Sequence, residues 1–182
     1  IQSYPKLSKA IQSYPKPFND EQEKFVQSVS DYLVSRGLEP RTLGVTDYDM
    51  DSPLKAIRRL MLESNGLITI AFKRAIINNG AGKPSTFQEY SLDGQWLTSP
   101  YSHIEPAMAF QIGLPVLILR ENGVIQDGIL EQGVLGSYMP EFDLGKAVSD
   151  YLKTEEWNQI IRKWETQVSS VVELKGNPPK LF

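Results

Sequence analysis

One glutamate stands among neighbours that would change its chemistry. Glu105 lies early in a segment whose periodicity predicts a helix, opened by Ser99-Pro100 and stopped by Gly113. Small and apolar residues surround it on that helix, and burial of this kind raises the pKa of an unpaired carboxyl. Carboxyls with a shifted pKa gather at functional sites. The structural alternative is a glutamate that only complements the positive end of the helix dipole.

Other kinds of chemistry are excluded or weakened by the residues present. The chain has no cysteine and one histidine, His103, which excludes thiolate catalysis, disulfides and Cys- or His-rich metal sites. Asp47, Asp49 and Asp51 begin like a calcium loop, but Arg58 stands where the loop needs its last glutamate, which favours a solvated acidic turn. No P-loop or Gly-x-Gly-x-x-Gly sequence occurs. We therefore expect no metal and no cofactor.

Length and charge describe an ordinary globular protein. With 182 residues, 41% hydrophobic and 23% charged, the chain is expected to form one α/β domain over residues 1–182. Residues 1–10 would be an N-terminal extension, repeated in part because residues 1–6 recur as 11–16, and residues 145–182 a C-terminal helical segment and tail. The net charge of −3 argues against a nucleic-acid partner. Without a long apolar run, we expect no membrane contact and a cytoplasmic location.

Strand-like and helix-like segments alternate from residue 9 onward. Nearly continuous apolar runs, such as 66–72 and 115–120, are typical of parallel strands covered on both faces. We predict a doubly wound, mostly parallel five-stranded sheet of flavodoxin-like type with helices on both faces and 66–72 inside the sheet. The expected strands are 9–14, 38–43, 66–72, 115–120 and 136–142, and two helical stretches, 145–153 and 155–172, finish the chain.

A single long connection, residues 73–98, interrupts this alternation. It follows the central strand at the edge where open α/β sheets bind ligands, and it carries Phe87, Tyr90 and Trp96. One interpretation is a lid whose segment 78–97 is mobile without ligand and orders over the site, with Trp96 as the main stacking partner of a planar base. The other is an inserted hairpin or flexible excursion, with Trp96 filling the core below it.

Two motifs resemble a known family. Glu105-x-Ala107-x-Ala109-x-x-x-Gly113-x-Pro115-Val116 resembles the nucleoside 2-deoxyribosyltransferase family and its N-glycosidase relatives, and the resemblance covers roughly residues 10–142. Tyr14-Pro15-x-Pro17-Phe18-Asn19-x-x-Gln22 resembles the family's first strand-to-helix turn, which lines the sugar pocket. TIR domains with NADase activity share the arrangement, including a glutamate on the corresponding helix.

The resemblance implies cleavage or transfer at the N-glycosidic bond of a nucleoside, a nucleotide or NAD, with Glu105 as the catalytic nucleophile. The family usually carries an aspartate at or just after the third strand, where this chain has Ala71-Phe72-Lys73-Arg74, so Glu89 and Asp93 are candidates for a second acid. Lys73 and Arg74 favour phosphate or carboxylate recognition, or are surface charges. The expected substrate-binding residues are Tyr14, Phe18, Phe72, Arg74, Trp96, Ser99, Tyr101, His103 and Met108.

Two other classes of function remain open. The same pocket could hold a nucleotide signal without turning it over, as a sensor domain does, or the chain could be an interaction domain that has kept the fold alone. A helical stripe near the C-terminus bears on partners, because it either packs on the sheet or forms a homo-oligomer or partner-domain contact. The stripe consists of Trp157, Ile160, Ile161, Trp164 and Val168.

Overall fold

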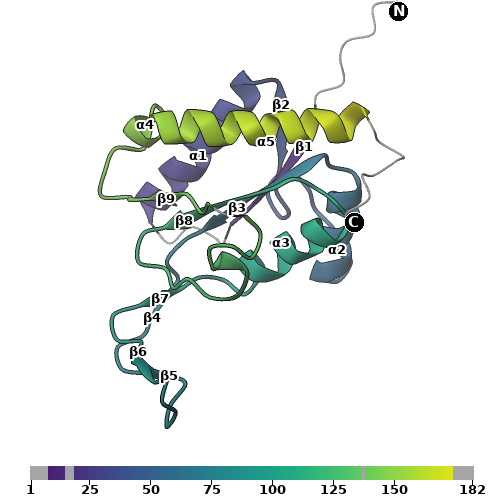
Figure 1. Cartoon of the computed structure of the whole chain (residues 1–182). Coiled ribbons are helices and arrows are strands. Elements are labelled where there is room, and N and C mark those ends of the chain that lie inside the picture. Colours follow the sequence, from purple (N-terminus) through teal and green to yellow (C-terminus); the bar gives the residue numbers. More distant parts are fainter. Residues whose placement is uncertain (1–7, 15–18, 137, 174–182) are drawn as a thin grey trace, which may run out of the picture.

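A five-stranded, all-parallel sheet forms the centre of the molecule (Figure 1). The structure, a computed structural model, describes residues 8–14, 19–136 and 138–173. The strand order is β2-β1-β3-β8-β9, with β3 in the middle, as a doubly wound flavodoxin-like sheet requires. The strands are β1 (Ser8–Ser13), β2 (Leu38–Arg41), β3 (Gly66–Ala71), β8 (Val116–Glu121) and β9 (Glu141–Phe142).

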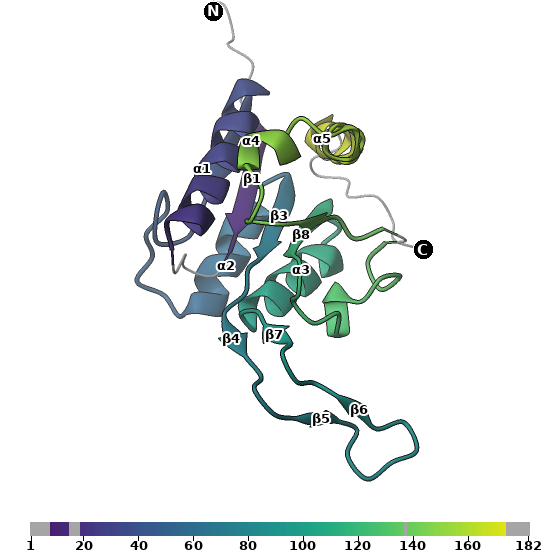
Figure 2. The ribbon, with the colours of Figure 1, turned by 90° about the vertical axis from the view of Figure 1, so that its left-hand side faces the viewer.

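Helices cover both faces of this sheet (Figure 2). One face carries α1 (Asp20–Ser35), the short α4 (Val148–Tyr151) and α5 (Glu155–Glu173). The other face carries α2 (Pro53–Leu62), α3 (Tyr101–Gln111) and a single 3₁₀ turn, η1 (Gly128–Leu130). The predicted fold class is confirmed.

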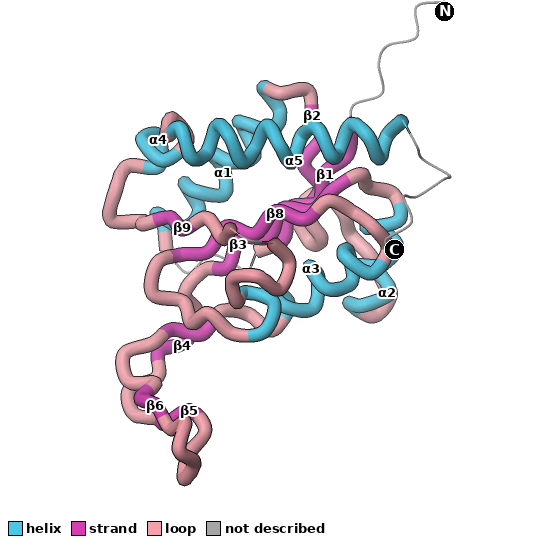
Figure 3. Tube along the Cα trace, viewed as in Figure 1, coloured by secondary structure: helices cyan, strands magenta, loops and turns pink. Residues whose placement is uncertain are grey.

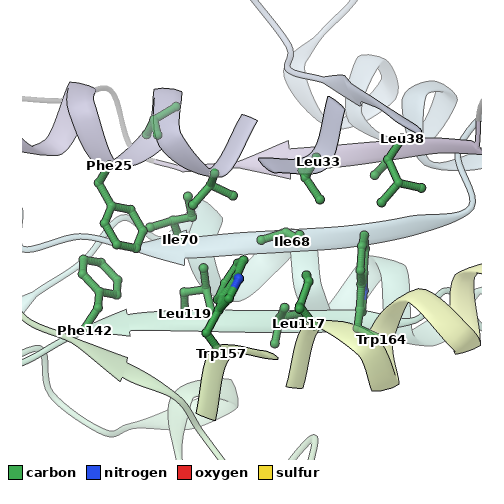
Figure 4. Packing of buried hydrophobic residues seen from close by; sticks show 14 of the residues in the cluster. Phe25, Leu33, Leu38, Ile68, Ile70, Leu117, Leu119, Phe142, Trp157 and Trp164 are labelled. Carbon is green, nitrogen blue, oxygen red and sulfur yellow. The ribbon is translucent and has the colours of Figure 1, made fainter. Parts of the chain in front are cut away.

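Alternation along β3 assigns its side chains to the two faces. Every residue of β3 is buried. Ile68, Ile70 and Phe72 belong to the large core under α1 and α5, whereas Leu67 belongs to the cluster under α2 and α3. Figure 4 shows the large core, in which the rings of Trp157 and Trp164 lie over the sheet. Period-two alternation thus separates a face of pure packing from a face that can carry a site.

Local signals in the sequence fix several helix ends. The Asn19 side chain accepts a hydrogen bond of 2.9 Å from the backbone N–H of Gln22, so Asn19 is the N-cap of α1. Gly37 and Gly113 follow α1 and α3 with φ of 76° and 77°, a left-handed conformation that favours glycine. These caps set where the connections to β2 and β8 begin.

Two predicted strands and one predicted helix are shorter in the structure. The expected strand 136–142 is reduced to Glu141–Phe142, because Pro140 has no N–H to continue the ladder, although its carbonyl accepts from Arg120 N at 3.0 Å. The expected strand 38–43 ends at Arg41, and Leu43 makes only an isolated bridge to Asp47. The expected helix 145–153 is the single turn of α4.

Residues 73–98 form a projecting hairpin, which we call the arm. Strand β4 (Ala75–Ile76) pairs antiparallel with β7 (Trp96–Leu97), and β5 (Ala81–Gly82) pairs with β6 (Tyr90–Ser91). Figure 3 shows the arm as a narrow extension at the lower left of the view, pointing away from the sheet and its helices. The inserted-hairpin interpretation is therefore the one that the fold supports.

The C-terminal stripe packs mostly into the core. Trp157, Ile161, Trp164 and Val168 are at most 2% exposed, and only Ile160 is partly buried. Trp164 also donates from its ring nitrogen to the carbonyl of Pro115, at 3.2 Å. Among the described helices, none has the length and apolar character needed to cross a membrane.

Gly66 gives a direct test of this packing. A Cβ atom at Gly66 would lie 2.6 Å from Val168 Cγ2 and 2.8 Å from Trp164 Cζ2, closer than side chains tolerate. Gly66→Ala should therefore lower the free energy of unfolding by about 1–3 kcal/mol, measured by urea denaturation. Gly136→Ala is the matched control, because its nearest contact would be 4.0 Å away. Equal stability of the two variants would contradict the close approach of α5 to β3.

Candidate active site

A small cavity lies at the carboxyl end of β1, and Glu105 from α3 is part of its wall. Its volume is about 50 Å³, far below the roughly 300–1,000 Å³ of typical ligand pockets. The apolar part of the lining comes from β1, the loop after β2, and α2. The lining residues are Ile11, Gln12, Ser13, Tyr14, Thr42, Leu43, Ile57, Leu60 and Glu105.

The carboxyl group of Glu105 is largely removed from water. Burial raises its pKa above the ordinary value, and a hydrogen bond with the Ser13 side chain lowers the pKa by less. Ser13, itself 7% exposed, ends β1 on the same face as Ile11, which is why its hydroxyl meets Glu105. The result is a largely desolvated carboxyl group with Ser13 as its hydrogen-bond partner, in a wall that also contains Tyr14, Thr42 and apolar side chains.

Tyr14 is the other predicted residue that the structure places at this cavity. Its hydroxyl hydrogen-bonds the Thr42 side chain, and partial burial raises its pKa. Phe18 lies outside the described residues. Gln22, from the same motif, is buried and donates from its amide to the carbonyl of Lys73, at 3.4 Å. Through Gln22, the motif over residues 14–22 therefore connects α1 to the start of the arm.

A second predicted group meets at the start of α3. Arg74 donates from Nη1 to Ser99 Oγ at 3.1 Å, and the backbone N–H of Tyr101 donates to the same oxygen at 3.3 Å. Ser99 is buried, whereas Arg74 and Tyr101 are exposed. Glu105 follows Tyr101 by about one helical turn, so a cationic group and a phenol stand at the amino end of the helix that carries the buried carboxylate.

Three predicted substrate-binding residues lie elsewhere. Phe72 is fully buried in the core on the opposite face of the sheet, against Phe25 and Phe142, because it follows the alternation of β3. The imidazole of His103 faces Asp127, with Nε2 3.8 Å from Oδ1. Met108 packs against the cluster under α2 and α3 and is absent from the cavity wall.

Trp96 lies at the base of the arm and not in the cavity wall. Its backbone N–H donates to the carbonyl of Gly123 at 3.2 Å, and its carbonyl accepts from Ile125 N at 2.9 Å. Its half-buried ring packs against the cluster that contains Val124, with Lys73 Nζ 5.9 Å from the ring centroid. This placement fits the core-filling alternative for Trp96.

The other two rings of the arm also leave the cavity uncovered. Phe87 is 97% exposed and Tyr90 is 49% exposed. The Tyr90 ring lies across Gly82, where a Cβ atom would be 2.2 Å from it. Because the arm points away from the sheet (Figure 2), it does not form a lid in this conformation. Closure on a bound ligand stays a prediction.

The two candidates for a second acid, Glu89 and Asp93, accept hydrogen bonds from backbone N–H groups of the arm itself. Glu89 accepts from the backbone N–H of Ser85 at 2.6 Å, and Asp93 accepts from that of Gly80 at 2.8 Å. Glu105 is the single carboxylate in the cavity wall as far as the described residues extend. Those same residues contain no group of three or more histidine, aspartate or glutamate side chains placed to hold a metal ion.

Three residues that make contacts at these sites, Ser13, Thr42 and Glu121, were not predicted from the sequence. Ser13 and Thr42 supply the polar contacts of Glu105 and Tyr14, and the alternation of β1 pointed to Ser13, because it shares a face with Ile11. Glu121, 6% exposed at the end of β8, accepts from Lys73 N at 2.8 Å, and Lys73 Nζ lies 3.8 Å from it. The charge of Lys73 is thus paired with Glu121. Of the two neighbouring cations, Lys73 and Arg74, it is Arg74 that is exposed to solvent.

Comparison with known proteins gives structural neighbours only. No protein-family model matches the chain, and no curated protein matches it. The fold resembles the CMP N-glycosidase BcmB of Clostridium botulinum, with 16% identity over 80% of this chain and 95% of that one, at a TM-score of 0.49. It also resembles the TIR domains of the activated Roq1 resistosome, which recognises the effector XopQ, with 14% identity over 92% and 84% of the chains, at a TM-score of 0.42.

These neighbours are of the two kinds that the sequence motifs resemble, an N-glycosidase and TIR domains. At these identities and TM-scores, neither likeness carries an argument about the activity of this chain. The function of this chain has to be argued from Glu105 and its surroundings.

Trp96→Ala separates the two roles considered for this ring. Because Trp96 packs at the base of the arm, we expect a loss of about 2 kcal/mol of stability, half or less of the cost of a fully buried tryptophan. A drop in melting temperature of about 4–8 °C should follow. Phe87→Ala, at an exposed position, should change stability by less than about 0.5 kcal/mol. An unchanged melting temperature for Trp96→Ala would contradict the core-filling interpretation and favour Trp96 as a stacking partner for a ligand.

Glu105→Gln tests the burial of the carboxyl group through its pH dependence. A carboxyl whose pKa is raised in the folded state destabilises the fold once pH rises through that pKa, because the folded protein then holds a buried charge. The variant should be more stable than the wild type at pH 7–8, and the gain should vanish below the ordinary glutamate pKa of 4.5. Thermal melts from pH 4 to pH 8 measure this difference. A constant difference across that range would show that Glu105 is not desolvated.

Proposed function

We propose that this protein cleaves or transfers the N-glycosidic bond of a nucleoside, a nucleotide or NAD, with Glu105 as the nucleophile. The observation that carries the proposal is the environment of Glu105: a desolvated carboxylate, held by Ser13, at the carboxyl end of a central parallel strand. Burial of this kind costs stability, and such groups concentrate where chemistry is done.

The proposed reaction has two steps, formation and hydrolysis of a covalent bond between the sugar and Glu105. An Oε atom of Glu105 attacks C1′ as the C1′–N bond breaks, and the electron pair of that bond leaves with the base. The base of a nucleoside or nucleotide takes up a proton, whereas the nicotinamide of NAD leaves as a neutral molecule without one. Water then attacks C1′ and gives up a proton, the bond to Glu105 breaks, the sugar is released and the carboxylate is restored. In a transferase, a ring nitrogen of a second base replaces the water. Carboxylates stabilise the positive charge at C1′ by the same means in O-glycosidases.

The size of the cavity limits what reaches Glu105. About 50 Å³ accommodates only the part of a substrate around the reacting carbon. The base and any phosphate then lie outside, toward the start of α3. There the exposed Arg74 has further N–H donors besides the one that it directs to Ser99, a geometry that suits a phosphate. This favours a nucleotide over a free nucleoside.

A sensor domain is the second candidate, and one observation favours it. Within the described part of the chain, the cavity wall offers Glu105 and no second carboxylate to protonate the leaving base. A protein that binds a nucleotide without turning it over needs no such acid. Base release therefore decides between the two.

The experiment is a panel of nucleosides, nucleotides and NAD incubated with the protein, with released base measured by chromatography. The wild type should release base, and Glu105→Gln should lower kcat at least about 1,000-fold, as expected for loss of a nucleophile. Ser13→Ala should keep partial activity but move the acid limb of the pH–rate profile to higher pH, because the hydrogen bond that lowers the Glu105 pKa is gone.

Arg58→Gln, a change at a charged residue outside the cavity wall, serves as the control. Tight binding of a nucleotide without base release would identify a sensor. Base release that survives Glu105→Gln would reject Glu105 as the nucleophile.

A further inference from the structure

The outer half of the arm contributes little to the packing of the rest of the molecule, from which it projects (Figure 3). This half is a two-stranded ladder without a third strand, and such hairpins are marginally stable in water. Lys83 and Ser85 adopt φ of 51° and 62°, a left-handed conformation that is unfavourable for residues other than glycine. The tip of the arm therefore has a defined backbone shape that includes two unfavourable conformations.

Hydrogen bonds fix the tip in that shape. Lys83 Nζ donates to Gln88 Oε1 at 2.6 Å, and Thr86 Oγ1 donates to the carbonyl of Lys83 at 2.8 Å. The Glu89 carboxylate caps the N–H of Ser85. The turn so formed presents Phe87 outward, 97% exposed. A fixed turn with a phenylalanine at its end has the form of a docking element.

The same chain carries a large apolar groove. It has a volume of about 940 Å³ and lies between α5, the end of α3 and the amino-terminal half of β8. The groove exists because β9 pairs only with Arg120 and Glu121, which leaves the earlier part of β8 without a neighbouring strand in the described chain. Its apolar wall includes Phe110, Leu114, Val116, Ile118, Met139 and Ile160.

Charges beside the groove are complementary to those beside Phe87. Glu156 and Lys163 line the groove from α5, and seven residues of helix separate them by about 10 Å. Lys83 and Glu89 flank Phe87 at the tip of the arm. An acid and a base beside the groove thus have a base and an acid beside the ring to pair with.

One chain cannot bring these two parts together. The arm leaves the sheet after the carboxyl end of β3, whereas the groove lies beside the amino end of β8, the neighbouring parallel strand. The arm also points away from the rest of the molecule (Figures 1 and 2). The ring and the groove can therefore meet only between two molecules.

We propose that Phe87 of one copy docks into the groove between α5 and β8 of a second copy of this chain, with Lys83 and Glu89 facing Glu156 and Lys163. This contact is independent of the proposed activity. If each copy offers its arm to the other, the contact closes into a two-fold dimer, and if it does not, it builds a ring or a chain.

Sedimentation velocity from 1 to 200 µM provides the first test. The wild type should associate as concentration rises. Phe87→Ser should weaken association by about 30-fold or more, as expected for a central aromatic anchor. Gln167→Trp, which adds a ring at an exposed groove position, should do the same by filling the groove. Val34→Ser, at an exposed apolar position on α1, is the control and should associate normally.

Mixing the two weakened variants gives the decisive result. Phe87→Ser keeps an intact groove and Gln167→Trp keeps an intact arm, so an equimolar mixture should form a one-to-one pair that neither variant forms alone. Thermal melts confirm that both variants fold. A monomeric wild type at 200 µM, or unchanged association of Phe87→Ser, would overturn the proposal. Failure of the mixture to pair would overturn the groove as the receptor of Phe87.

Discussion

Burial of the central sheet on both faces is the constraint on which the rest of this molecule depends. All six residues of β3 are inaccessible, so each neighbouring side chain is committed to one face or the other. Toward α1 and α5, Phe25, Phe72 and Phe142 form one continuous aromatic core. Toward α2 and α3, the same alternation brings Ser13 under Glu105. The proposed chemistry therefore lies on that second face, where Ser13 meets Glu105.

The arm and the cavity are positioned by the same sheet edge but serve different surfaces. Because β1 and β3 are parallel, they end at the same edge of the sheet. Ser13 and Tyr14 lie at the carboxyl end of β1, and the arm begins after the carboxyl end of β3. The base of the arm is fixed by Trp96 against Val124 and by the pairing of Lys73 with Glu121. From there the arm leaves the molecule. The carboxyl edge thus supplies the small cavity beside Glu105 and, separately, the base of the projecting arm.

Sequence patterns determined the sheet well because they are local. Apolar runs and the glycine after α3 each depend on a few neighbouring residues, and the structure has the central strands and the end of α3 where these patterns predict them. The site was harder. The apolar neighbours of Glu105 in the sequence were enough to identify it as a candidate. Phe72 and His103 were chosen because they are near the motifs in sequence. In the structure, strand alternation places Phe72 in the core, and His103 lies beside Asp127. The direction of the arm depends on how a hairpin leaves the sheet, which no residue spacing encodes.

The raised pKa of Glu105 bears on whether this residue is functional or structural. A glutamate kept only for the helix dipole gains most when it is solvated and charged beside the first turn. Glu105 instead has its pKa raised by burial, and the hydrogen bond from Ser13 offsets that effect only in part. Burial therefore makes the charged form of Glu105 less favourable in the fold than it is in water. A domain that needed the position only for packing would have no reason to retain a carboxyl group there, whereas a nucleophile, or a contact for a cationic or hydroxylated ligand, requires it.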